Sequence, residues 1–259
     1  MLLALDVGNT ETTIGLVRGE VIAAHWRLTT TVDRTPDEWG VALGALLLHA
    51  GHSPNEIRAG VMASVAPGVT QSLLQGVRAL TGASPLIVDA ASPLPVRLDV
   101  EEPLTVGADR IVNTLAAVER YHADTIVVDF GTATTFDCIT GDGRFIGGVI
   151  MPGLRTSAEQ LTRRAAKLPA TELEPPERVI GRRTEECIRA GVLLGTADAV
   201  DGILRRIQRE WPTAERPGIV ATGGLASTIV PLTELIEQVD ADLTLHGLRL
   251  AARHLGARW

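Results

Sequence analysis

The chain has 259 residues, of which 45% are hydrophobic and 21% are charged, and its formal net charge is −7. This composition is typical of a folded globular protein and excludes a disordered chain. The negative charge argues against nucleic acid as a partner, because a phosphate-binding surface needs concentrated basic residues, and no apolar run approaches the ~20 residues of a membrane span.

The first half of the chain opens with LALDVGNTETTIGL at 3–16, which predicts two strands joined by a tight turn. The mixed segment 21–28 predicts a third strand beside them. A helix over 35–51 follows, because Thr35 and Glu38 have the spacing of a capping box. The remaining elements expected in this half are a strand at 60–68, a helix at 69–80, a strand at 85–90 and a helix at 108–121.

The second half repeats this opening with IVVDFGTATTFDCI at 126–139 and a third strand at 144–153. A helix at 154–166 and a proline-containing loop at 168–184 come next. The last elements expected are a helix at 185–211, a strand within 218–227 that runs into a double glycine and a short helix, and a C-terminal helix at 245–255.

The two openings align when the sequence is shifted by 123 residues. The shift places Asp6 on Asp129, Gly8 on Gly131 and Thr12 on Thr135. Each half then continues in the same order of strands and helices, which indicates an internal duplication of an α/β unit. We expect two domains, 1–115 and 116–259, hinged to each other.

The repeated turn, Asp-x-Gly-x-Thr, has the chemistry of a phosphate site. Glycine lets a ligand approach bare backbone N–H groups, and Asn9, Thr10, Thr132 and Thr134 add side-chain donors at the turns. The preceding aspartate is placed to hold a cation that neutralises phosphate. One such turn would more often be a plain hairpin. Two copies at matched places favour the functional interpretation.

Other nucleotide sites are excluded by the same sequence. Lys167 is the single lysine and lies outside any G-x-x-x-x-G-K-[ST] pattern, so there is no P-loop and no protein-kinase lysine. No G-x-G-x-x-G follows the first strand, which argues against a dinucleotide fold. Phosphates would therefore be held by backbone and hydroxyl groups between two lobes.

Four blocks of the sequence belong together: DVGNTETT at 6–13, GADR at 107–110, DFGTATT at 129–135 and GGVIMPG at 147–153. These blocks resemble the type III pantothenate kinases, within the actin, sugar-kinase and heat-shock-chaperone ATPase superfamily. The resemblance covers essentially the whole chain. It implies two duplicated ribonuclease-H-like, actin-like ATPase lobes with a nucleotide cleft between them, and phosphorylation of pantothenate by ATP.

The resemblance also assigns roles to residues. It implies that Asp109 is the catalytic base, although a carboxylate in the first turn of a helix also suits the helix dipole, which would keep it ionised. Substrate-binding residues would be Gly107, Ala108, Asp109, Arg110 and Thr184. ATP-binding residues would be Asp6, Gly8, Asn9, Thr10, Thr12, Thr13 and Thr132, with Mg²⁺ as the nucleotide's cation. Asp129 would bind a monovalent cation, K⁺ or NH₄⁺.

Several alternatives stay open at this point. Arg110 could pair with an acid on the surface instead of binding a substrate carboxylate, and Thr184 could be a helix N-cap. Gly223 and Gly224 could line the adenosine or form a tight turn. Val100 stands where some members of the family have a substrate-contacting tyrosine.

The remaining expectations concern the environment of the protein. Two isolated cysteines, Cys138 and Cys187, are expected to be buried free thiols in a reducing cytoplasm, and they exclude a structural zinc site. The chain opens directly into a strand, without a signal peptide. The resemblance implies a homodimer. Competing functions are another small-molecule kinase or phosphatase of the superfamily, or a non-catalytic regulatory factor on this fold.

Overall fold

The structure is a computed structural model that describes residues 1–213 and 215–259. These residues form two compact units: Met1–Arg120, Gly143–Phe145 and Asp242–Trp259 make the first, and Tyr121–Asp142 and Ile146–Ala241 make the second. The strands are β1 Leu2–Val7, β2 Glu11–Arg18, β3 Val21–Thr29, β4 Ala59–Ser64, β5 Leu86–Val88, β6 Arg97–Leu98, β7 Thr125–Phe130, β8 Ala133–Ile139, β9 Arg144–Pro152, β10 Gly218–Thr222 and β11 Gln238–Val239. The α-helices are α1 Pro36–His49, α2 Pro67–Thr81, α3 Ala108–Tyr121, α4 Leu154–Arg164, α5 Thr184–Glu210, α6 Ala226–Ile229 and α7 Leu243–His254. Short 3₁₀ helices occupy Pro54–Glu56, Pro103–Thr105 and Val230–Leu232.

The first unit contains a five-stranded sheet of order β3-β2-β1-β4-β5. β1 pairs antiparallel with β2 and parallel with β4. Apolar side chains cover both faces of the central strands, since Leu3 and Leu5 belong to one buried cluster and Leu2 and Ala4 to the other. Two hydrophobic layers therefore hold this sheet.

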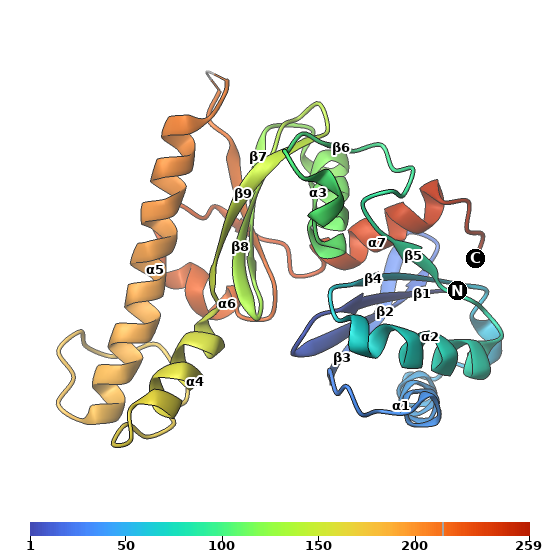
Figure 1. The fold of residues 1–259 in the computed structure, drawn as a ribbon, viewed down its shortest axis with the longest axis horizontal. Coiled ribbons are helices and arrows are strands. Elements are labelled where there is room, and N and C mark those ends of the chain that lie inside the picture. The colour runs from blue at the N-terminus through green and yellow to red at the C-terminus, as the bar shows by residue number, and fades with distance from the viewer. Residues whose placement is uncertain (214) are drawn as a thin grey trace. The chain divides into compact units, whose positions relative to one another are not determined.

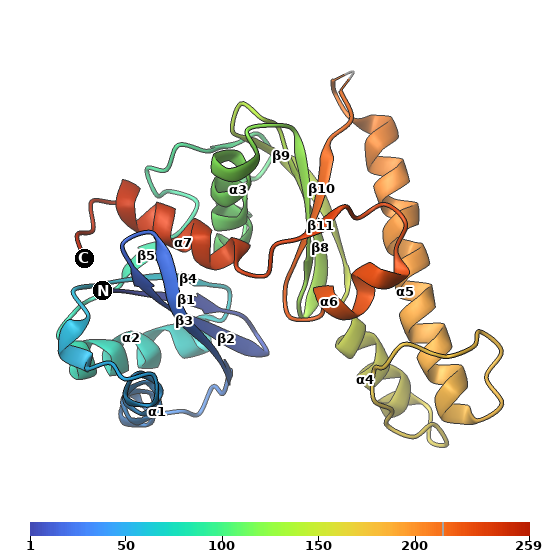
Figure 2. The ribbon, with the colours of Figure 1, turned by 180° about the vertical axis from the view of Figure 1, so that it is seen from behind.

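Helices cover both faces of the first sheet. α1 and α2 lie side by side on one face, where Trp39, Leu43 and Leu73 pack in the same cluster as Leu3 and Leu5 (Figure 1). α3 and α7 supply the cluster on the other face, and α7 contacts β1 and β4 (Figure 2). The first sheet is thus the centre of a three-layer unit.

The second unit repeats the topology. Its strands have the order β11-β10-β7-β8-β9, with β7 antiparallel to β8 and parallel to β10. The long helix α5 runs along this sheet (Figure 1) and packs with β7 and β8 through Leu193, Val200 and Leu204. β6 extends the sheet by pairing with Arg144 and Phe145 at the start of β9.

The predicted duplicated α/β architecture is confirmed by these matching strand orders. The C-terminal helix is the exception to the linear order, because α7 follows the strands of the second sheet but packs on the first. The compact units therefore differ from the two sequence halves 1–115 and 116–259 in the placement of this helix, and also of residues 116–120 and Gly143–Phe145.

Local signals in the sequence are also found in the structure. Thr35 caps α1, with the Glu38 N–H donating to the Thr35 hydroxyl at 3.3 Å and the Thr35 N–H donating to the Glu38 carboxylate at 2.7 Å. The expectation of two buried thiols is wrong for Cys187, which is exposed, whereas Cys138 is buried. Cys187 lies in the first turn of α5, one residue before the buried Ile188, and does not belong to the buried face of the helix.

Asp124 ties together three segments of the second unit. Its Oδ1 accepts the Gly141 N–H at 2.8 Å, and its Oδ2 accepts the Trp211 Nε1–H at 2.8 Å and the Thr213 hydroxyl at 2.9 Å. Burial works to raise the pKa of this carboxyl, but the three hydrogen bonds outweigh burial and hold the pKa below its usual value. Asp124 is therefore an ionised anchor for the end of α5.

Candidate active site

The first Asp-x-Gly-x-Thr turn joins β1 to β2. Asp6 is the second-last residue of β1 and pairs with Thr13, and the Gly8 N–H donates to the Glu11 carbonyl at 3.0 Å. A Cβ on Gly8 would lie 2.9 Å from that same carbonyl oxygen, so the turn needs glycine at this position. Asn9 and Thr10 are exposed at the tip of the turn, where a ligand can reach them.

The Thr12 hydroxyl supports this turn from inside. Thr12 is fully buried, and its Oγ1 lies 2.9 Å from the Oγ1 of Thr30. The Thr30 hydroxyl donates to the Gly8 carbonyl at 2.8 Å, so Thr12 must be the donor to Thr30. The hydroxyl of Thr12 thus braces the backbone of the turn, and a direct contact with ATP stays a prediction.

The two turns differ in length by one residue, which corrects the gap-free alignment. Asp6 pairs with Thr13, whereas Asp129 pairs with Thr135. The shift of 123 residues that places Thr12 on Thr135 is therefore wrong after the turn. The register makes Thr134 the counterpart of Thr12. Both threonines are fully buried, which agrees with the corrected alignment.

The GADR block lies at the start of α3 in the same unit. Val65, which follows β4, donates its N–H to the Val7 carbonyl at 3.0 Å. A Cβ on Gly107 would lie 3.4 Å from Cγ1 of this Val65 and only 2.5 Å from Oδ1 of Asp109. Val65 thus links the first turn to Gly107, and Gly107 makes room for the Asp109 carboxylate.

The Asp109 carboxylate is partly buried, and its Oδ1 accepts the Arg110 N–H at 2.8 Å. Burial raises the pKa of Asp109 above its ordinary value, while the Arg110 N–H and the Arg110 charge act more weakly in the opposite direction. Burial thus acts on the pKa of Asp109 in the direction opposite to the expected effect of the helix dipole. A raised pKa makes the ionised carboxylate a stronger proton acceptor.

Arg110 is oriented by an aromatic ring. Its guanidinium carbon lies 4.9 Å from the centre of the Phe145 ring, and Phe145 itself is buried. This cation–π contact positions the guanidinium over the ring, and its planar shape suits a carboxylate. The arrangement supplies a cation next to the base.

The second turn joins β7 to β8. Asp129 lies on β7, and the Gly131 N–H donates to the Ala133 carbonyl at 3.0 Å. Gly223, with φ of +90°, directly follows β10, the strand that pairs with β7. A Cβ on Gly223 would lie 2.4 Å from Oδ1 of Asp129 and 2.7 Å from the Phe130 nitrogen. Gly223 is therefore required by a turn that packs against the Asp129 carboxylate.

Thr184 is the first residue of α5 and is exposed. The alternative in which Thr184 caps the helix is wrong, because the N-cap is Arg183. Around this helix start the Glu186 carboxylate accepts the Arg182 N–H at 2.8 Å. The hydroxyl of Thr184 is thus not needed to begin the helix, and substrate contact stays a prediction.

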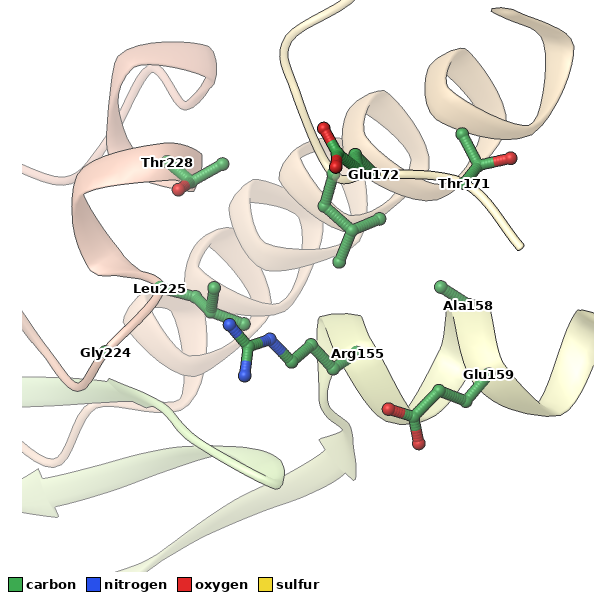
Figure 3. A pocket seen from close by; sticks show the side chains of 9 residues that line it. Arg155, Ala158, Glu159, Thr171, Glu172, Gly224, Leu225 and Thr228 are labelled. Atoms are coloured by element: carbon green, nitrogen blue, oxygen red, sulfur yellow. The ribbon is translucent and has the colours of Figure 1, made fainter. Parts of the chain in front are cut away.

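A cavity of about 530 Å³ lies within the second unit, next to the turn after β10 (Figure 3). It is lined by Arg155, Ala158, Glu159, Thr171, Glu172, Leu173, Gly224, Leu225 and Thr228. Sequence reasoning named only Gly224 of these residues, and left its role open. The loop 168–184 carries no motif, so nothing in the sequence indicated that its residues Thr171–Leu173 line a cavity.

The site residues fall into two sets, one in each unit. The first holds the Asp6–Thr13 turn and the block Gly107–Arg110; the second holds Asp129, Thr132 and Thr184. Among the described residues, no group of three or more His, Cys, Asp or Glu side chains gathers to hold a metal. A single carboxylate such as that of Asp6 still fits Mg²⁺, which takes one or two carboxylates plus water and phosphate oxygens.

Two glycine turns with aspartates, in duplicated α/β units, define a protein of the two-lobed actin-like ATPase and sugar-kinase fold. Solved structures with this fold are similar to the chain. One is the activator of the 2-hydroxyisocaproyl-CoA dehydratase from Clostridium difficile with bound ADPNP, with a TM-score of 0.56, 15% identity and coverage of 98% of this chain and 92% of that chain. Another is component A of the (R)-2-hydroxyglutaryl-CoA dehydratase of Acidaminococcus fermentans, with a TM-score of 0.56, 13% identity and coverage of 98% and 96%. At these identities the likeness concerns the fold alone.

The particular family follows from closer relatives. The family model for type III pantothenate kinase matches residues 2–206. The chain is 48% identical to the type III pantothenate kinase of Thermomicrobium roseum over 261 residues, covering 99% of this chain and 100% of the relative. It is 44% identical to that of Syntrophotalea carbinolica over 250 residues, covering 96% and 97%. The chain therefore belongs to the type III pantothenate kinase family.

Proposed function

We propose that this protein transfers the γ-phosphate of ATP to the hydroxyl of pantothenate and so forms 4′-phosphopantothenate, the first step of coenzyme A biosynthesis. Membership of the family supports the substrate. The observation in the structure that carries the proposal is the partly buried Asp109, with its raised pKa, beside the stacked guanidinium of Arg110. A base and a cation side by side suit a substrate that offers a hydroxyl and a carboxylate.

In this proposal Asp109 accepts the proton of the attacking hydroxyl, and Arg110 binds the substrate's carboxylate. Gly107, Ala108 and Thr184 contact the same substrate. Phosphoryl transfer depends mainly on positioning and charge neutralisation, so one base at the hydroxyl is sufficient.

The glycine turns hold the nucleotide. The turn from Asp6 to Thr13 and the residue Thr132 bind ATP phosphates through N–H and hydroxyl groups. Mg²⁺ at Asp6 would neutralise phosphate charge, and Asp129 would bind K⁺ or NH₄⁺. The cavity beside Gly224 would take the nucleoside, because it lies next to the turn that packs against Asp129.

We further propose that domains 1–115 and 116–259 are the two lobes, except that α7 belongs to the first unit. The protein would act as a homodimer in the cytoplasm, in keeping with the family resemblance and with two cysteines that form no disulfide. In the described part of the chain, no helix is both long and apolar enough to span a bilayer.

A coupled assay of ADP release tests this function. The purified protein is supplied with ATP, Mg²⁺ and pantothenate, with and without K⁺, and the product is identified by mass spectrometry. Turnover that forms 4′-phosphopantothenate and depends on K⁺ is expected. Phosphorylation of a sugar or of acetate, with no reaction on pantothenate, would contradict the substrate, and equal turnover without any monovalent cation would contradict the role of Asp129.

A further inference from the structure

The corrected alignment of the two turns exposes a difference between them. In the first turn the carbonyl of Thr10 accepts the N–H of Thr30 at 2.9 Å. The Thr30 hydroxyl adds a second brace by donating to the Gly8 carbonyl and receiving the Thr12 hydroxyl. Thr30, which directly follows β3, thus holds this turn through both its backbone and its side chain.

In the second turn a glycine stands in the place of Thr30. The Gly153 N–H donates to the Thr132 carbonyl at 3.1 Å, the bond that Thr30 makes to Thr10. A Cβ on Gly153 would lie 2.4 Å from the carbonyl oxygens of both Gly131 and Thr132, so no side chain fits there. The buried hydroxyl of Thr134, the counterpart of Thr12, consequently has no hydrogen-bond partner among the described residues.

The first turn of α4 supports the second turn at a different carbonyl. The Thr156 hydroxyl donates to the Thr132 carbonyl at 2.7 Å. Because Gly153 and Thr156 both bind this carbonyl, the start of α4 is fixed directly to the second turn. In the first half, by contrast, α1 begins only at Pro36, six residues after Thr30.

Arg155 lies between these two anchors and enters the cavity. Figure 3 shows its side chain running from the start of α4 toward Leu225 and Gly224. Of the nine residues that line the cavity, Arg155 alone is cationic, whereas Glu159 and Glu172 are anionic. The positive end of the α4 dipole adds to the charge of Arg155 at this end of the cavity.

We propose that the Arg155 guanidinium binds a phosphate oxygen of the nucleotide. Thr156 is then a positioning residue, because its hydroxyl bond to the Thr132 carbonyl fixes the start of α4, and with it Arg155, relative to the second turn. This inference rests on the proposed function and adds two residues to its nucleotide site. The two glutamates disfavour phosphate elsewhere in the cavity, so the phosphates lie at the Arg155 end and the nucleoside extends toward Glu172.

Binding of nucleotide fragments tests the role of Arg155. Displacement of a fluorescent ADP analogue by ADP and by adenosine is measured for the wild type and for Arg155→Met, which keeps the apolar stem but removes the charge. ADP is expected to bind about tenfold more weakly to the variant, the range of one charge-assisted hydrogen bond, while adenosine binds unchanged. Arg163→Met, in the last turn of α4 and outside the cavity lining, is the matched control and should leave both constants unchanged.

An equal loss of ADP and adenosine binding would overturn the phosphate contact, because it would mean that Arg155 meets the nucleoside. Unchanged ADP binding would overturn it as well. The measurement needs no pantothenate. A wild type that binds ADP through Arg155 but fails to phosphorylate pantothenate would therefore refute the proposed substrate and leave the nucleotide contact standing.

The positioning role of Thr156 is tested by a split between kinetic constants. Thr156→Val removes the hydroxyl at nearly constant shape and should raise KM for ATP several-fold, with KM for pantothenate unchanged. Thr156→Ser retains the donor and should restore KM for ATP. A serine variant no better than the valine variant would show that the hydroxyl does not hold the turn. A matched rise in KM for both substrates would equally overturn the role.

Discussion

Gly107→Ala is the substitution for which the structure gives the most specific expectation. A Cβ at this position would lie 2.5 Å from Oδ1 of Asp109, whereas ordinary van der Waals contact begins near 3.4 Å. The carboxylate would have to retreat by roughly 1 Å, and a misplacement of that size costs about 100-fold in rate. The retreat would also stretch the 2.8 Å hydrogen bond from the Arg110 N–H.

The fold should tolerate this change, because the atom in the way is the end of a side chain and not backbone. We expect kcat of Gly107→Ala to fall about 100-fold, with a thermal midpoint close to that of the wild type, measured by ADP release and by thermal denaturation. Gly40→Ala is the control, since a Cβ there meets its nearest neighbour, the Gly76 carbonyl, at 3.7 Å. An unchanged kcat in Gly107→Ala would refute the idea that this glycine places the base.

Three further predictions follow from charge and exposure. Because burial raises the pKa of Asp109, kcat/KM should fall as the pH is lowered through that raised pKa. Asp109→Asn should raise the thermal midpoint at pH 7 by a few degrees, because it removes a charge that burial disfavours. A lowered thermal midpoint would contradict this expectation. Asp124→Ala removes the acceptor of three hydrogen bonds and should lower the free energy of unfolding, measured by urea denaturation, by about 2 kcal/mol at pH 7. The difference between the two proteins should shrink as the pH falls below ~4, because the wild-type carboxylate is then protonated. A thiol reagent should modify Cys187 in the native protein and Cys138 only after unfolding; native reaction of Cys138 would contradict its burial.

The sequence predicted the parts of the fold that depend on local chemistry. The capping box at Thr35 and the repeated apolar strands around Asp6 and Asp129 specified α1 and both hairpins, because these signals act over a few neighbouring residues. Long-range packing was not accessible in the same way. No local signal says that α7 leaves the second half of the chain and packs against β1 and β4.

The same limit applied to the site. The aspartates and glycines of the turns were found because they recur, but the extra residue in the first turn was invisible to a gap-free alignment. Gly153 is the last residue of the GGVIMPG block, and the sequence alone did not indicate why a glycine is needed there. Its role became clear only when the carbonyl oxygens of Gly131 and Thr132 were seen at the place of its missing side chain. Desolvation of Asp109 likewise depends on three-dimensional burial, which helix position alone does not give.

The most direct test of the central claim compares the wild type with Asp109→Asn in pantothenate-dependent ADP release at saturating ATP, Mg²⁺ and K⁺. Displacement of a fluorescent ADP analogue by ADP serves as the control for an intact nucleotide site. If Asp109 accepts the proton of the attacking hydroxyl, the variant binds ADP like the wild type but turns over at least about 100-fold more slowly. Equal turnover of the two proteins would contradict the assignment of Asp109 as the base.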